Sequence, residues 1–508
     1  MPSLPPNRFL LTIAVMSATF LQVLDTTIVN VALPHMAGEL SATPDQISWV
    51  LTTYLVATGV VLPLTGYLTD RMGQKRLLLI SIFGFVVTSG FCGVAGSLAE
   101  IVTFRVLQGL FGAALIPLSQ SIMLQAFSLS ERGRAMAIWG VGIMVGPILG
   151  PTLGGYLTEA LSWRWTFFIN LPIGLLSLLL AWRTVPDSPR RERPLDWRGL
   201  ALMFVAIGGL QFVIDRGNRE DWFNSGLIQI VSIASGAAML GFIYHSLTHR
   251  RQTLLDLGIF RDRNFTSACV LLVIFSFGLF SAIMLQPLML EGLLGYPASI
   301  AGWFMAPRGV ASMISMVIVG RLINHVSPRV LVVIGIVFGV IGSSAMTRYS
   351  LDVNAWFLIW PALLQGLAVG LVFVPLGTVA YATLPRELTP EAAGIYNLIR
   401  TMGTSVGISI AATIMARESQ VAWSEAGSHI HPFNGALYDY FARLGLNPTD
   451  PQAPAMLARE LARQAQMIGI LDAFVAIAWS FVCMLPFVFL LRPGLLNRQA
   501  GSPPLAAE

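Results

Sequence analysis

The chain has 508 residues, of which 55% are hydrophobic and only 11% are charged. Soluble domains carry about 25% charged residues, so this composition excludes an ordinary soluble protein and predicts one that meets lipid over most of its surface. The net charge of +5 then matters for orientation in a membrane, and we expect no nucleic acid partner. Three cysteines lie singly in apolar runs, a spacing that indicates neither a disulfide framework nor a metal site.

Fourteen apolar stretches are long enough to cross a bilayer, since a spanning helix needs about 20 residues. They are 10–32, 49–68, 77–97, 102–124, 135–157, 166–184, 199–214, 226–246, 266–287, 300–320, 330–348, 355–381, 396–415 and 468–491. The first stretch is too long for a signal peptide and has no convincing cleavage site, so we interpret it as an uncleaved span. The sequence therefore predicts an all-α polytopic membrane protein.

The basic residues predict the orientation of these spans. The termini and the six loops on their side hold 20 of the 31 Lys and Arg residues, whereas the six short loops opposite hold four. Cytoplasmic loops are enriched in Lys and Arg, so both termini are expected to be cytoplasmic. The long loop 416–467 then faces outward. Its four prolines and the polar helical stretch Ala455 to Gln466 fit either a flexible connector or a folded docking surface.

The spans fall into two blocks of six around an extra pair. Residues 1–184 form an N-terminal six-helix bundle, 185–265 the two extra spans with cytoplasmic linkers, and 266–491 a C-terminal six-helix bundle that includes loop 416–467. Residues 492–508 form a cytoplasmic tail. Two six-span halves are typical of secondary transporters, whose substrate site lies near the middle of the membrane between the halves.

Two charged residues lie inside predicted spans of the first half. Asp25 interrupts the first span, and Arg105 lies in the fourth, followed by Gly109 and Gly112. A carboxylate at such a position costs several kcal/mol, about 2.5–3.5 on insertion scales, and is usually functional, for example in proton relay. Arg105 could lower the pKa of a nearby carboxyl group or snorkel to the interface. We interpret the two residues as a proton-coupling pair.

The loop between spans 2 and 3 reads Gly66-Tyr67-Leu68-Thr69-Asp70-Arg71-Met72-Gly73-Gln74-Lys75-Arg76. Glycine permits a tight turn close to neighbouring helices because it lacks a Cβ. Asp70 beside Arg71, Lys75 and Arg76 suggests a latch that holds one conformation. An anchor for cytoplasmic orientation explains the basic residues, but it does not explain Gly66, Gly73 and Asp70.

Span 5 carries glycine at every fourth position, with two prolines interleaved. The residues are Gly142, Gly146, Pro147, Gly150, Pro151, Gly154 and Gly155. Small residues at this interval let helix backbones touch, and proline kinks a helix wherever neighbours satisfy the freed groups. An ordinary helix-packing face is the alternative interpretation; it explains the glycines but not the two prolines.

These motifs together resemble the major facilitator superfamily. The 66–76 loop matches its loop signature, the span-5 stripe resembles the antiporter motif of its drug exporters, and the strings 163–174 and 397–407 resemble the 14-span drug:H+ antiporter family (EmrB/QacA type), closest to EmrB-type multidrug efflux pumps. The likeness covers nearly the whole chain. The second-half loop departs from it, because Asn324 stands where the first half has Asp70.

The resemblance implies the major facilitator fold with 14 transmembrane helices (6+2+6) and proton-driven export of hydrophobic drugs by alternating access. It also implies a bacterial inner-membrane location, a periplasmic membrane-fusion adaptor and an outer-membrane channel as partners. An exporter of a specific metabolite or siderophore fits the motifs equally well. The chain has no GxxxxGK[ST] motif, so we expect the proton gradient, and no cofactor, to drive transport. The candidate substrate-cavity residues, chosen for polar or amphipathic character, are Gln22, Asn30, Trp139, Tyr381, Asn397 and Arg400.

The residues around Ser405 fit a different class of function, an intramembrane hydrolase. The run Gly403-Thr404-Ser405-Val406-Gly407 fits the G-x-S-x-G pattern of hydrolases, but that pattern requires a strand-to-helix turn. Here the run lies inside a predicted helix, so we interpret Ser405 as a packing residue. Arg308 in span 10 and Arg400 in span 13 are further buried cations, each expected to neutralise a helix end or an acid.

Overall fold

The computed structural model describes residues 7–128, 131–188, 190, 196–248, 255–431, 434–443 and 452–491. Within these residues, fourteen helical segments are long and apolar enough to span a membrane. The predicted fold class, an all-α polytopic membrane protein with fourteen spans, is therefore confirmed. Helices satisfy every backbone hydrogen bond within the segment, which is why a chain of this composition folds into them in lipid.

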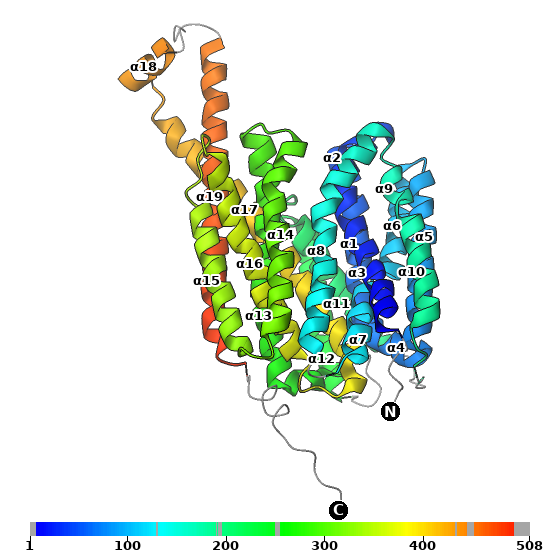
Figure 1. The fold of residues 1–508 in the computed structure, drawn as a ribbon. Helices are drawn as coiled ribbons and strands as arrows, with labels where there is room; N and C mark the ends of the chain where they lie inside the picture. The colour runs from blue at the N-terminus through cyan, green and yellow to red at the C-terminus, as the bar shows by residue number, and fades with distance from the viewer. Residues whose placement is uncertain are drawn as a thin grey trace, which may run out of the picture.

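The first six spans form one bundle (Figure 1). Span 1 is α1 and span 3 is α5, while spans 2, 4 and 6 are each built from two consecutive helices and span 5 is α8. The bounds are α1 Arg8–Glu39, α2 Pro44–Ile47, α3 Trp49–Val61, α4 Thr65–Met72, α5 Gln74–Val94, α6 Leu98–Gly112, α7 Leu115–Ala126, α8 Arg132–Ala160, α9 Trp165–Phe168 and α10 Asn170–Thr184.

The last six spans form a second bundle beside the first (Figure 1). The bounds are α13 Arg263–Pro287 with a π-helical turn Leu288–Leu293, α14 Ala298–Leu322, α15 Pro328–Met346, α16 Ala355–Ala380, α17 Thr389–Ser428, α18 Gly435–Arg443 and α19 Gln452–Val488. We use "lower end" for the end of the molecule at which α1 begins and α19 ends, the bottom of Figure 1, and "upper end" for the opposite one.

The extra pair consists of α11 (Trp197–Arg216) and α12 (Gly226–Thr248). Helix α11 packs against α3 of the first bundle and α17 of the second, and α12 packs mainly against α11. The side chains of Gln211 and Ser405 join α11 to α17 through a buried hydrogen bond of 2.7 Å. The extra pair thus bridges the two bundles on one side of the molecule.

Polar residues at helix starts explain where several spans begin. An N-cap side chain accepts a hydrogen bond from a backbone N–H that has no partner inside the helix. Ser97 caps α6 in this way, Asp196 caps α11, Asp262 caps α13 and Asn354 caps α16. Each of these four spans therefore starts at a polar residue that satisfies a backbone donor the membrane could not.

Helices α17 and α19 rise well beyond the rest of the upper end (Figure 1). The sequence placed the end of span 13 at residue 415, but α17 continues without a break to Ser428, and α19 begins at Gln452. The stretch 416–467 is therefore largely helical in its described part, and it includes the polar helical stretch expected from Ala455 to Gln466. Hydropathy alone missed this because the extension is polar although it remains helical.

Candidate functional site

Asp25 lies at the centre of the first bundle and has no exposed surface. Its Oδ2 accepts a hydrogen bond from Nη1 of Arg105 at 2.6 Å. Its Oδ1 accepts two more, from Nε2 of Gln108 at 3.0 Å and Nδ2 of Asn170 at 2.9 Å. Both carboxylate oxygens are therefore satisfied by side chains of α6 and α10, and the sequence-predicted pair of Asp25 and Arg105 is in direct contact.

Arg105 is held by more than the carboxylate. Its Nε donates to the carbonyl oxygen of Val50 at 3.0 Å, and its Nη1 also donates to Oε1 of Gln108 at 2.8 Å. The guanidinium carbon lies 4.1 Å from the centroid of the Tyr54 ring. Cation–π contacts of this kind are worth about 2 kcal/mol or more when desolvated. The cation is thus fixed in one position against α3.

The cluster extends to α5 through Asn170. The same Nδ2 that bonds Asp25 also lies 3.0 Å from Oγ of Ser89, and Ser89 donates to the carbonyl oxygen of Phe167 at 3.0 Å. Five of the six spans in the first bundle therefore contribute a polar group within two hydrogen bonds of the carboxylate. A proton on Asp25 would remove the charge that Arg105 neutralises. The hydrogen bonds that Arg105, Gln108 and Asn170 donate to the carboxylate would then have to rearrange.

Sequence reasoning missed Gln108, Asn170 and Ser89 as members of this cluster. Gln108 follows Arg105 by three residues, and residues three apart lie on the same face of a helix. Asn170 is a buried amide inside a span. These signals were available in the sequence, but neither says which helix lies opposite.

The glycines of span 5 face the helix that carries Asp25. A Cβ at Gly146 would lie 2.5 Å from Cγ1 of Val23, and a Cβ at Gly150 would lie 2.1 Å from Oγ1 of Thr27. A Cβ at Gly154 would lie 2.9 Å from the backbone oxygen of Ile28. The α1 turn around Asp25 therefore packs directly on the backbone of α8.

The two remaining glycines of that motif differ, since a Cβ at Gly142 would lie 1.6 Å from Cε of Met16, the far end of a flexible side chain, whereas Gly155 has room for one. Gly142 faces the end of the Met16 side chain, and the nearest atom to a Cβ at Gly155 is 4.0 Å away, on Val31. Pro147 and Pro151 both lie inside α8, which continues from Arg132 to Ala160. Gly155 thus takes no part in the close contact with α1 that its neighbour Gly154 makes.

The opposite side of α8 packs on α14 of the second bundle. A Cβ at Gly309 would lie 2.2 Å from the Ile148 side chain, and one at Gly320 would lie 2.6 Å from Cβ of Ala137. At the lower end, a Cβ at Gly133 would meet Ile323 at 2.2 Å. The residue numbers run in opposite directions, so α8 and α14 form a close antiparallel seam between the bundles.

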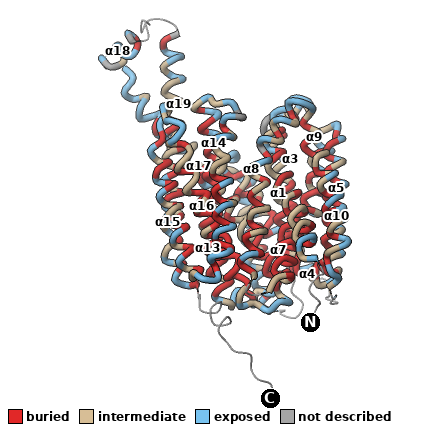
Figure 2. Tube along the Cα trace, in the orientation of Figure 1, coloured by how far each residue is buried: buried red, intermediate tan, exposed pale blue. Residues whose placement is uncertain are grey.

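Other contacts between the bundles gather at the lower end. Nδ2 of Asn397 in α17 donates to Oε1 of Gln120 in α7 at 2.7 Å. Trp139 stacks on Phe373 at 5.8 Å. These side chains are buried, as are most residues that line the facing surfaces there (Figure 2). The two bundles are therefore packed against each other at the lower end.

The loop motif takes part in this lower contact. A Cβ at Gly66 would lie 2.6 Å from Cα of Glu391 at the start of α17. Gly73 has φ +83°, a left-handed conformation that favours glycine. Arg71 donates to the Tyr67 hydroxyl at 3.1 Å. Asp70 and Lys75 are half-buried, and Arg76 is exposed; the latch remains a prediction.

The candidate cavity residues fall into three places. Trp139, Tyr381 and Asn397 are buried at the lower contact, where the backbone oxygen of Tyr381 accepts from Nη1 of Arg132 at 2.8 Å. Arg400 is half-buried one turn above Asn397. Gln22 lies inside the first bundle, where it accepts from the N–H of Ile116 at 3.2 Å.

Asn30, in contrast, is exposed. The structure therefore does not gather these six residues into one site, because polarity alone does not say which way a helix faces.

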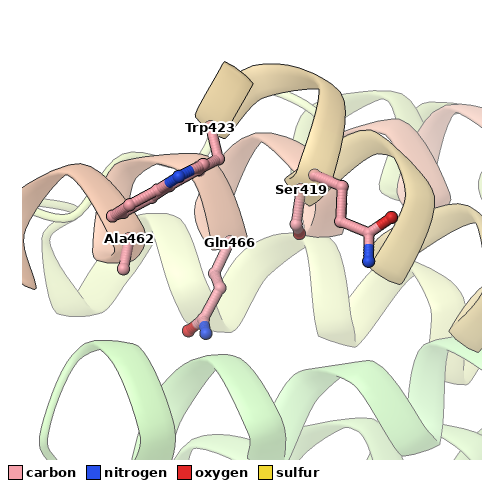
Figure 3. A pocket seen from close by; sticks show the side chains of 6 residues that line it. Ser419, Trp423, Ala462 and Gln466 are labelled. Carbon is pink, nitrogen blue, oxygen red and sulfur yellow. The ribbon is translucent and has the colours of Figure 1, made fainter. Parts of the chain in front are cut away.

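A groove lies in the extension at the upper end, between α17 and α19 (Figure 3). It is lined by Ser419, Gln420, Trp423, Ala462, Ala465 and Gln466. Its volume of about 210 Å³ is below the range of roughly 300–1,000 Å³ that suits drug-sized ligands. The groove belongs to the second bundle, whereas the Asp25 cluster lies in the first. Among the described residues, no group of three His, Cys, Asp or Glu could hold a metal ion.

Comparison with known protein families assigns the chain to one of them. A family model described as Major Facilitator Superfamily matches residues 15–408. The chain belongs to the major facilitator superfamily, and it is a multi-pass membrane transporter that acts on small molecules. The fold agrees, since the proton:xylose symporter XylE superposes with a TM-score of 0.61 at 16% identity and covers 97% of this chain and 98% of that chain.

Two curated relatives are similar over nearly their whole length. The multidrug export protein EmrB of Haemophilus influenzae is 35% identical over 490 residues, which cover 95% of this chain and 96% of the relative. The fatty acid resistance protein FarB of Neisseria gonorrhoeae is 34% identical over 487 residues, which cover 95% of this chain and 96% of the relative. The resemblance to EmrB-type pumps is thus confirmed.

Proposed function

We propose that this chain is a proton-driven multidrug efflux antiporter of a bacterial inner membrane, with both termini in the cytoplasm. It exports hydrophobic and amphipathic compounds by alternating access and is not an enzyme. The observation that carries the proposal is the buried Asp25 cluster on α1, a helix that packs on the glycine stripe of α8. Similarity to multidrug export proteins supports the substrate class.

The coupling begins at the carboxylate. With Asp25 ionised, Arg105, Gln108 and Asn170 hold α1, α6 and α10 together. A proton that reaches Asp25 from the outer side removes the negative charge and leaves Arg105 without its counterion. Buried ion pairs are stable only while both charges are present. Protonation therefore favours a different arrangement of α1 against its neighbours.

The movement passes from α1 to the second bundle through α8. Gly150 contacts Thr27 on one side of α8, and Ile148 contacts Gly309 of α14 on the other. A shift of α1 must move α8, because the glycines of α8 have no side chain that could change conformation and absorb the shift. In the present arrangement the bundles meet at the lower, cytoplasmic end, so protonation would open that end to drug from the cytoplasm or inner leaflet.

The proton gradient supplies enough energy for this work. One elementary charge that crosses the membrane is worth about 2.3 kcal/mol per 100 mV, which corresponds to a concentration gradient of about fiftyfold. The return of Asp25 to its ionised form, with the proton released inward, restores the pair with Arg105. We propose that Arg105 drives that release.

The test uses purified protein in proteoliposomes with an imposed pH gradient and a fluorescent hydrophobic compound as substrate. Asp25→Asn should reduce gradient-driven export at least tenfold. Asp352→Asn is the matched control, because Asp352 is an exposed carboxylate between α15 and α16, and it should export like the parent. Export by Asp25→Asn at the parental rate would refute the role of Asp25.

We further propose that the upper extension contacts a periplasmic membrane-fusion adaptor, which in turn joins an outer-membrane channel. The extension carries exposed large apolar side chains, among them Trp423, Tyr438 and Met456, and exposed aromatic residues are typical anchors of protein interfaces. Trp423→Ser should reduce co-purification of a single-span adaptor. Unchanged co-purification of the Trp423→Ser and Tyr438→Ser double variant would count against this surface.

A further inference from the structure

Arg308 is a buried cation without a partner in the second bundle. It lies in α14, its side chain is almost wholly buried, and none of its three guanidinium nitrogens has a hydrogen-bond partner among the described residues. Arginine stays protonated in proteins, so burial cannot be relieved by loss of a proton. Arg105 in the first bundle shows the usual solution, since it bonds Asp25, Gln108 and the carbonyl of Val50.

The four helices α13 to α16 of the second bundle supply no acidic residue near Arg308. A Cβ at Gly366 of α16 would lie 2.2 Å from the backbone oxygen of Arg308, so α14 and α16 are in close contact at this point. The sequences of α13, α14, α15 and α16 contain neither Asp nor Glu. The ionisable residue within electrostatic range of Arg308 is Tyr349, whose phenol is uncharged at neutral pH. The expectation that Arg308 neutralises an acid of the chain is thus not met within the described residues.

Two amides of the same bundle also have free polar atoms. Oε1 of Gln365 in α16 has no partner, although its Nε2 donates to Ser343 at 3.0 Å. Gln286 in α13 is fully buried, and neither of its polar atoms has a partner among the described residues. These two amides therefore add one unused donor, Nε2 of Gln286, and two unused acceptors to the unpartnered cation.

Tyr349, which interacts electrostatically with Arg308, belongs to an aromatic cluster. It packs edge-on against Phe357 at 5.8 Å and against Phe474 at 6.1 Å. An unneutralised guanidinium within electrostatic range of such a cluster fits a ligand that has an anionic head and an apolar body, because guanidinium binds carboxylate with two parallel hydrogen bonds.

We propose that Arg308 binds the anionic head of an amphipathic ligand, of the carboxylate class, during the transport cycle. The inference rests on the proposed export function and narrows its substrate class. Gly309, the next residue, contacts Ile148 of α8 across the seam between the bundles. Arg308 therefore lies beside the surface that shifts when the bundles move, and the ligand reaches it when α14 and α8 separate.

The test measures binding of two probes to the purified full-length protein in neutral detergent at pH 7.5. One probe is 11-(dansylamino)undecanoate, and the other is its uncharged methyl ester. The parent should bind the acid at least tenfold more tightly than the ester. Arg308→Gln should lose that preference and bind the ester within twofold of the parent, while Arg308→Lys should retain a smaller preference because it keeps the charge.

The control is Arg321→Gln, since Arg321 lies on the same helix but is exposed, and it should keep the parental preference. Equal binding of acid and ester by the parent would overturn the proposal, and so would a full acid preference in Arg308→Gln or Arg308→Lys. If Arg308→Gln does not fold, the parent and Arg308→Lys still decide the question. Binding of the uncharged ester does not depend on Arg308. If the acid preference is absent but the ester still binds, this proposal fails and the proposed export function stands.

A parallel titration separates two sources of the anionic head. Phosphatidylglycerol added in the same detergent should compete with the acid probe if a lipid headgroup occupies the site. Competition that disappears in Arg308→Gln would overturn the carboxylate class, because the anion of this lipid headgroup is a phosphodiester. Absence of competition, with the acid preference present, would support an exported carboxylate.

Discussion

The hydroxyl of Thr27 lies 3.2 Å from the backbone oxygen of Gly146, to which it donates a hydrogen bond across the contact between α1 and α8. Thr27 follows Asp25 by two residues, and Gly146 belongs to the glycine stripe. The candidate proton site and the stripe are therefore parts of one contact, which sequence motifs alone present as two separate features.

The first prediction concerns that contact. Gly150→Ala should destabilise the protein by about 1–3 kcal/mol, because its Cβ would lie 2.1 Å from Oγ1 of Thr27 and 2.7 Å from its Cβ. It should also slow export severalfold. Thermal unfolding in detergent and efflux from proteoliposomes measure the two effects.

The matched control for Gly150→Ala is Gly155→Ala on the same helix. The nearest atom to its Cβ would be 4.0 Å away, so there is room for a methyl group. The change should be neutral, or stabilising by about 1 kcal/mol, since alanine favours helix over glycine. Equal losses in both variants would show that the stripe has no special contact.

The second prediction separates stability from coupling at the buried pair. Asp25→Asn should affect folding as well as coupling, because the substitution leaves Arg105 buried without its counterion. Loss of one partner of such a pair costs about 3–5 kcal/mol. Asp25→Asn should therefore lower the melting temperature.

The double variant Asp25→Asn/Arg105→Gln should melt at a higher temperature than either single variant, because it buries no net charge. It should still fail to export against a pH gradient. If the decrease in melting temperature of the double variant equals the sum of the decreases in the two single variants, the residues are not a coupled pair.

The third prediction concerns the lower contact. Gly66→Ala should weaken it, because the new Cβ would lie 2.6 Å from Cα of Glu391. Cys269, which is buried near Tyr381 and Tyr396, should then react faster with N-ethylmaleimide. Mass spectrometry of Cys269, with buried Cys92 as the internal reference, measures the change.

Gly90→Ala serves as the control for Gly66→Ala, since nothing lies within 4 Å of its Cβ position. Its Cys269 labelling rate should match that of the parent. Identical rates in all three proteins would show that Gly66 does not hold the lower end closed.

The fourth prediction distinguishes a transporter from a hydrolase. Ser405→Ala removes one hydrogen bond to Gln211, whose net contribution is about 0.5–1.5 kcal/mol. Export should continue at nearly the parental rate. A folded Ser405→Ala protein that has lost all activity would instead point to a nucleophile.

Sequence periodicity predicted the spans well because each is a long apolar segment with its own hydrogen bonds. The pairing of Asp25 with Arg105 was also accessible, since two opposite charges inside spans of one bundle have few other ways to be neutralised. The placement of Gln22 and Asn30 was not accessible, because it depends on which neighbour each face of α1 meets. Likewise, only the packing of α14 reveals that the guanidinium nitrogens of Arg308 have no hydrogen-bond partner among the described residues.

Helix α17 has 40 residues, so it is about 60 Å long at 1.5 Å per residue, roughly twice the thickness of the hydrocarbon core. Its lower part touches Gly66 and Gln120, and its far part carries Trp423. A tilt of about 10° around the lower contact would displace the tip by about 10 Å. A small rearrangement at the lower end of α17 would thereby become a large displacement of its upper tip, beyond the opposite face of the bilayer.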